Sequence, residues 1–175
     1  MEDEEWKTKA LRENDPFNKY LSAFIAHNLF YNLYKKTEHP SADLFFGDSE
    51  RAIEVRKLID DNGLLFEILK PELEVYVGFI PTYSEEYWGK SDTVGIAKGL
   101  TEAFNKEDVE QTVDLLLKWL YKVRCNLVHG EKNYNDERQK NLLKQSSSLL
   151  IKILTHLLKA YRETYVYGEK KDKFL

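Results

Sequence analysis

Apolar residues recur at intervals of three and four along most of the chain, which is the spacing that places them on one face of an α-helix. The pattern predicts five helical stretches, over residues 16–36, 49–62, 64–73, 109–129 and 136–161. The last two are both long, and the short connector between them contains residues 131–134. Short connections join antiparallel neighbours, so we predict an all-α helical bundle with two long antiparallel C-terminal helices.

Three segments interrupt this periodicity. Residues 78–99 contain Pro81 and four glycines, and we interpret them as a long loop with at most one short helix. Residues 1–14 are highly charged and predict a frayed arm or a short helix. The charged segment 168–175 ends the sequence. We expect both terminal segments to be mobile.

The bulk composition is that of one globular domain. The chain has 175 residues, of which 42% are hydrophobic and 13% aromatic, enough for one sizeable core and too few for two. We therefore take residues 1–175 as a single domain. The acidic start MEDEEWK lacks the apolar core of a signal peptide, and no apolar run is long enough to span a membrane. We expect a cytoplasmic protein without membrane contact.

The potential metal ligands are scattered. The single cysteine, Cys125, excludes an internal disulfide. None of the four histidines has a second histidine four residues away, the spacing with which a helix presents two ligands to zinc. We expect no metal site and no cofactor.

The charge is unevenly distributed. The whole chain carries a net charge of −4, but residues 118–175 contain 13 Lys and Arg against 6 Asp and Glu. Such asymmetry is a hint of an anionic partner, although a solvated basic face explains it equally well.

One short motif lies within this basic third, at the end of the fourth predicted helix. Lys122-Val-Arg-Cys-Asn-Leu-Val-His-Gly130 contains an arginine, Arg124, and five positions later a histidine, His129, followed by a glycine that suits a helix end. This arrangement, with Asn126 inside it and a long helix on either side, resembles the Arg-x4-His motif of the HEPN family. The first predicted helix is also similar to that of several HEPN groups, whereas residues 38–106 match poorly.

The resemblance implies a metal-independent endoribonuclease that acts as a homodimer, with the Arg and His of two subunits meeting at a composite site. It implies attack by the RNA 2′-hydroxyl on the adjacent phosphate, which leaves a 2′,3′-cyclic phosphate and a 5′-hydroxyl. Members of the family often act as toxins, paired with an antitoxin protein, or as phage-defence effectors. Other members are not catalytic and bind a nucleotide, an RNA or a protein partner.

The residues fit this chemistry when they are considered individually. His129 would exchange protons near neutral pH, and Arg124 offers a planar fork for two phosphate oxygens. We assign an orienting role to Asn126. Positions five apart on an ideal helix lie roughly 140° apart around its axis, so either the helix ends between them or a second chain completes the site. Six cations are predicted to track the RNA backbone: Lys118, Lys122, Lys132, Arg138, Lys140 and Lys144.

Each of these residues also has a plain structural explanation. Arg124 suits the negative end of a helix dipole, and His129 is an ordinary residue for a helix end. A non-catalytic HEPN-like module and a plain helical scaffold with a coincidental motif therefore remain as alternatives. We interpret the aromatic residues Tyr83, Tyr87 and Trp88 as packing residues rather than as platforms for bases.

Overall fold

The computed structural model describes residues 2–38, 62–89, 91–128 and 135–168. The predicted helix over 49–62 lies almost wholly outside these residues, as do the connector 131–134 and most of the C-terminal segment. The described chain forms six α-helices and one π-helical turn without any strand, so the prediction of an all-α bundle is confirmed. The elements are α1 (Glu2–Arg12), α2 (Pro16–Glu38), α4 (Asn62–Tyr87), α5 (Ser91–Asn105), α6 (Val109–Val128), α7 (Glu137–Tyr161) and η1 (Arg162–Val166).

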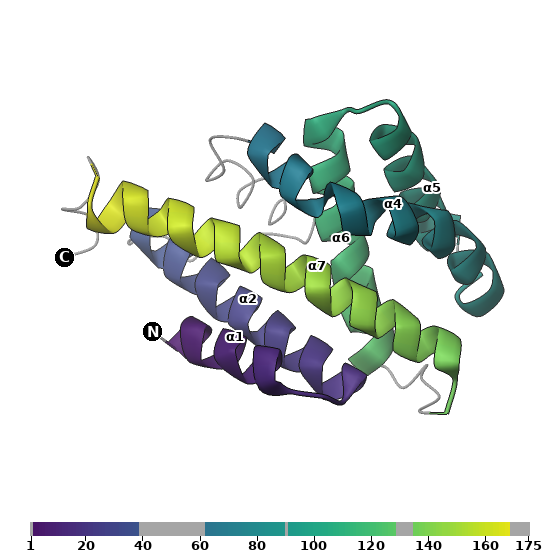
Figure 1. Cartoon of the computed structure of the whole chain (residues 1–175), viewed down its shortest axis with the longest axis horizontal. Helices are drawn as coiled ribbons and strands as arrows, with labels where there is room; N and C mark the ends of the chain where they lie inside the picture. Colours follow the sequence, from purple (N-terminus) through teal and green to yellow (C-terminus); the bar gives the residue numbers. More distant parts are fainter. Residues whose placement is uncertain (1, 39–61, 90, 129–134, 169–175) are drawn as a thin grey trace.

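The helices form two groups (Figure 1). In the first group α2 packs between α1 and α7, and in the second α5 packs between α4 and α6. Contacts of α4 with α7 join the two groups, and α6 contacts α2 and α7 less extensively than α4 contacts α7. The two long C-terminal helices therefore meet near one end rather than along their length. None of the described helices is both long and apolar enough to cross a membrane.

The N-terminal segment forms a packed helix rather than a frayed arm. Helix α1 lies against α2, and both Ala10 and Asp3 are buried. Burial raises the pKa of the Asp3 carboxyl, because a charged group loses the solvation that water provides. Glu4, one position later, pairs with Arg162 in η1, which ties the beginning of the described chain to its end.

Residues 78–99 are not a loop, and this sequence-based prediction was wrong. Helix α4 continues through Pro71 and Pro81 to Tyr87, and α5 begins at Ser91. A proline has no N–H and leaves the carbonyl four positions earlier without its helical donor. For Pro81 that carbonyl belongs to Val77, and the Thr101 hydroxyl of α5, which also lies 3.1 Å from the Ala97 carbonyl of its own helix, lies within donating distance of it at 3.0 Å. A side chain from another helix thus replaces the missing bond.

Two glycines of this region lie at positions that affect how α4 ends and how α5 packs. Gly89 has a positive φ of 50°, and its N–H donates to the Ser84 carbonyl at 2.9 Å, as in a common helix-ending turn. Gly99 lies inside α5, where an added Cβ would lie 3.4 Å from a methyl group of Leu115. A Cβ at this position would therefore just reach van der Waals contact with α6.

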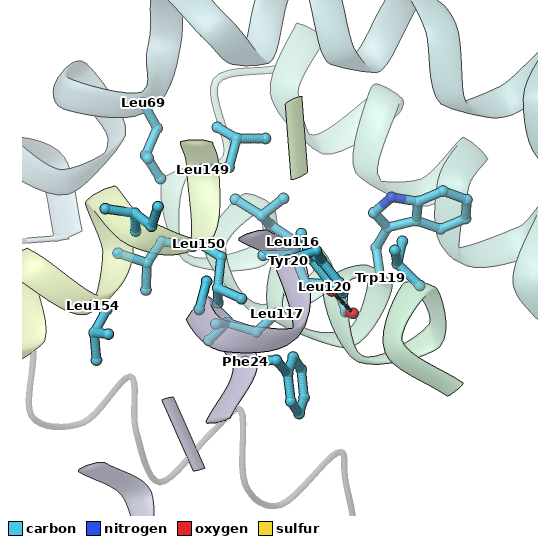
Figure 2. Packing of buried hydrophobic residues seen from close by; sticks show 14 of the residues in the cluster. Tyr20, Phe24, Leu69, Leu116, Leu117, Trp119, Leu120, Leu149, Leu150 and Leu154 are labelled. Carbon is cyan, nitrogen blue, oxygen red and sulfur yellow. Dashed lines mark hydrogen bonds between the residues drawn. The ribbon is translucent and has the colours of Figure 1, made fainter. Parts of the chain in front are cut away.

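The buried core lies where α2, α4, α6 and α7 converge (Figure 2). The helix predicted to begin near residue 136 is confirmed, with a buried apolar stripe from Leu142 to Tyr161, and Asp136 caps it by accepting from two backbone N–H groups. For α6 the apolar spacing predicts a stripe made of Val109, Val113, Leu116, Leu117, Leu120 and Val123, but Trp119, outside this stripe, is also fully buried. Burial of α6 on this additional side decides where its polar residues point.

A buried hydrogen-bond network holds Trp119 in place. Its indole N–H donates to the Tyr76 hydroxyl of α4 at 2.7 Å, and this hydroxyl lies 2.6 Å from the Ser146 hydroxyl of α7. Burial raises the pKa of Tyr76 well above its usual value, so the hydroxyl keeps its proton. Three helices that are distant in the sequence are therefore fastened at one point.

We expect Thr101→Val to destabilise the protein by roughly 1 to 3 kcal/mol, because the Val77 carbonyl would lose its replacement donor while the side-chain volume stays the same. Urea unfolding followed by circular dichroism measures this change. Thr101→Ser keeps the hydroxyl and serves as the matched control, with a smaller loss. Equal stability of the Val variant and the parent would show that Thr101 does not compensate for Pro81.

Candidate functional site

The candidate site lies at the C-terminal end of α6, whose last residue is Val128. His129 follows directly and, with Lys132, lies outside the described residues. Arg124 and Asn126 belong to the last turns of α6. Residues two apart on a helix point about 200° apart around its axis, so these two side chains face different surroundings.

Arg124 faces α2, and two aromatic rings, one from α2 and one from α6, support its guanidinium group. The guanidinium carbon lies 5.8 Å from the ring centre of Phe24 and 6.0 Å from that of Tyr121. The two rings are themselves 6.1 Å apart, and Phe24 is buried. Attraction of a cation to aromatic rings at this range is worth about 0.5–1 kcal/mol at an exposed site. The side chain is thereby held against α2 while remaining half-buried.

The charge of Arg124 is not neutralised within the described part of the chain, where no carboxylate pairs with it. One turn earlier, the Tyr20 hydroxyl of α2 donates to the Leu120 carbonyl (Figure 2). This bond fixes α6 against α2 beside the guanidinium. The arrangement can bind an anion, because the fork of an arginine presents several donors in one plane.

Asn126 points to the opposite side, into the interior between helices. It lines a hollow of about 20 Å³, which is room for roughly one water molecule. The other lining residues come from α2, α4, α6, α7 and the turn after α4, and they are Phe17, Tyr83, Trp88, Val123, Leu127, Gln139, Leu142 and Leu143. Within one protomer Asn126 and Arg124 therefore do not face a common substrate.

The other predicted cations lie on several different faces. Lys122 pairs with Asp92 of α5 at 3.0 Å, about 200° around α6 from Arg124. Lys118 lies one turn before Lys122 on the same face. Lys140 pairs with Glu137 at 3.1 Å, and Lys144 is exposed one turn further along α7. The structure thus does not join the described lysines to Arg124 in one continuous track.

Arg138 belongs to a cluster that fastens the start of α7 to the end of α4. Its guanidinium pairs with Glu86 and lies 5.8 Å from the ring centre of Phe79 and 5.4 Å from that of Tyr87. The Tyr87 hydroxyl donates to the carboxylate of Asp136, which also caps α7. This hydrogen bond is the main reason why the pKa of Asp136 is lowered and that of Tyr87 is raised. The cluster fixes the start of α7 against the end of α4.

Sequence reasoning missed the aromatic support of Arg124. The contact of Phe24 with Arg124 joins positions 100 residues apart, beyond the reach of any local sequence pattern. The interpretation of Tyr83 and Trp88 as packing residues is confirmed, since both are buried. Tyr87 stacks on Tyr83 with ring centres 4.4 Å apart. Among the described residues, no group of three His, Cys, Asp or Glu side chains gathers as a potential metal site.

No family model, no curated protein and no solved structure matches the chain. The likeness to the HEPN family therefore rests on the sequence motif alone.

The hydrogen bond between Tyr87 and Asp136 should make the stability of the protein depend on acid pH. A carboxyl group whose pKa is lowered by folding stabilises the fold above its unfolded pKa, near 3.8, and this contribution is lost as the pH falls through the folded pKa. We therefore expect Tyr87→Phe to lose less stability than the parent between about pH 6 and pH 3.

The urea midpoint of both proteins is measured at the two pH values. The acid-induced change in the midpoint is then compared between the parent and Tyr87→Phe, which separates the contribution of Asp136 from that of the other carboxylates. Tyr167→Phe is the control, because Tyr167 is 79% exposed. If Tyr87→Phe and the parent lost the same stability on acidification, the bond would not control the titration of Asp136.

Proposed function

We propose that the protein is a metal-independent endoribonuclease that works as a homodimer, with Arg124 and His129 as its catalytic residues. The observation that supports this most directly is the guanidinium of Arg124. It is held by Phe24 and Tyr121 at the end of α6 without a carboxylate partner among the described residues. A cation in such a position is available to a phosphate group.

In the proposed reaction the RNA 2′-hydroxyl attacks the neighbouring phosphorus while a histidine removes its proton. The bond from phosphorus to the 5′-oxygen breaks, and that oxygen takes a proton. The products are a 2′,3′-cyclic phosphate and a 5′-hydroxyl. His129 would transfer the protons because imidazole titrates near neutral pH. Arg124 would stabilise the negative charge that builds on the phosphate oxygens.

A second copy of the chain completes the proposed site. Arg124 faces α2 rather than the interior hollow, and His129 comes five positions later, roughly 140° further around an ideal helix. A two-fold axis near the end of α6 would bring the Arg124 of one subunit toward the His129 of the other. Asn126 would then orient the end of α6 from inside rather than touch the RNA.

A second candidate function is a non-catalytic module that binds a nucleotide, an RNA or a protein partner. The spread of the cations favours it, because Lys122, Arg138 and Lys140 are paired with carboxylates on different faces. A nuclease that follows a long RNA needs a more continuous basic surface than these residues provide. This candidate predicts a complex with nucleotide or RNA and no cleavage.

We expect His129→Ala to lower RNA cleavage by about 100-fold or more, which is the usual contribution of a general acid or base. Arg124→Ala should cause a loss of similar size. The assay incubates the parent and the variants with single-stranded RNA in the presence of a chelator and analyses the ends of the products. His156→Ala and Arg12→Ala are the controls, since both residues lie on other helices. Cleavage by His129→Ala at the parent rate would remove the proposed mechanism.

The composite nature of the site can be tested by mixing two inactive variants. Arg124→Ala subunits keep His129, and His129→Ala subunits keep Arg124, so a mixed dimer contains one complete pair across its interface. We expect subunit exchange to restore roughly a quarter of the parent rate, because about half of the dimers are mixed and one of their two sites is complete. If both variants bind RNA and their mixture stays inactive, the pair belongs to a single chain.

A further inference from the structure

Helix α4 presents a continuous uncharged stripe to the outside of the bundle. Leu64, Ile68, Pro71, Val75, Gly78 and Thr82 follow one another at intervals of four and three, the heptad spacing of helices that pair with other helices. On an ideal helix all six lie within about 80° of one another around the axis. All six are exposed, although four of them are apolar.

The exposure of the large side chains in this stripe is unusual for the molecule. Leu64 is 49% exposed, Ile68 is 40% exposed and Val75 is 63% exposed. They account for three of the six large hydrophobic side chains that are exposed in the described part of the chain. A Cβ added at Gly78 would meet nothing within 4 Å, so open space continues above the stripe. Exposed apolar residues that gather in this way mark interaction surfaces.

Acidic residues border the stripe along one edge. Glu67 and Glu74 lie about 60° and 80° around the helix axis from the centre of the stripe, both on the same side. Both side chains are exposed, and neither has an ion-pair partner among the described residues. The neighbouring charges are engaged within the chain, because Lys70 lies 3.6 Å from Glu107 and Glu72 pairs with Lys152. The edge therefore presents two negative charges that the described residues do not neutralise.

We propose that the α4 stripe binds an amphipathic helix of another protein whose apolar face is bordered by Lys or Arg. Apolar residues of such a helix would cover Ile68 and Val75, and its cations would meet Glu67 and Glu74. A second copy of this chain fits less well. Antiparallel pairing of α4 with itself would place this acidic edge against its own copy. Like charges so placed oppose association.

The test uses two synthetic peptides of about three heptads, both with Leu along one face, one bordered by Lys and the other by Glu. Fluorescence anisotropy measures their binding to the full chain. We expect the Lys-bordered peptide to bind about tenfold more tightly or better. The double variant Ile68→Ser/Val75→Ser should lose this binding by a similar factor, because it removes two exposed apolar contacts without touching the core.

The exchange Glu67→Lys/Glu74→Lys should reverse the preference in favour of the Glu-bordered peptide. Leu11→Ser is the matched control, since Leu11 is 56% exposed on α1, and it should bind as the parent does. Equal binding of both peptides, or parent-like binding by the Ile68/Val75 variant, would overturn the proposal. So would a homodimer, seen by light scattering, that dissociates in that variant, because the stripe would then bind its own copy.

Discussion

The rotational setting of α6 about its own axis determines the surroundings of every described candidate residue on that helix, and Trp119 fixes this setting. Its indole is fully buried and donates to the Tyr76 hydroxyl, which also contacts Ser146. If α6 turned about its axis, these buried polar groups would lose their partners, and each such loss costs about 1–3 kcal/mol. The helix therefore has one strongly preferred orientation against α4 and α7.

The directions of the polar residues near the end of α6 follow from this orientation. Asn126 comes seven residues after Trp119 and so lies on the same inward face, where it lines the small hollow. Arg124 lies about 140° from Trp119 around the axis, on the side that meets Phe24 of α2. The interaction that stabilises the core thus also brings the guanidinium against aromatic rings and turns Lys122 toward α5.

The sequence predicted the features of the fold that depend on local patterns. The stripe of α7 and its start near residue 136 were predicted because an amphipathic period acts within a few residues. The helices across residues 78–99 were missed because Pro81 is compensated by Thr101, which is 20 positions away in the chain. The inward direction of Asn126 was missed for a similar reason, since it depends on the contact of Trp119 with Tyr76, 43 positions earlier.

Helix α4 connects the two surfaces that we consider functional. Its inner face carries Tyr76, which holds α6, and Tyr87 near its end contacts the Asp136 cap of α7. Its outer face carries the stripe around Ile68 and Val75. Transmission of a signal between two sites requires an element with two discrete arrangements. The buried bonds of Tyr76 favour one arrangement of α4, α6 and α7 over any other. A helix bound to the stripe would therefore add a partner to the protein without changing the surroundings of Arg124, and the two surfaces would act independently.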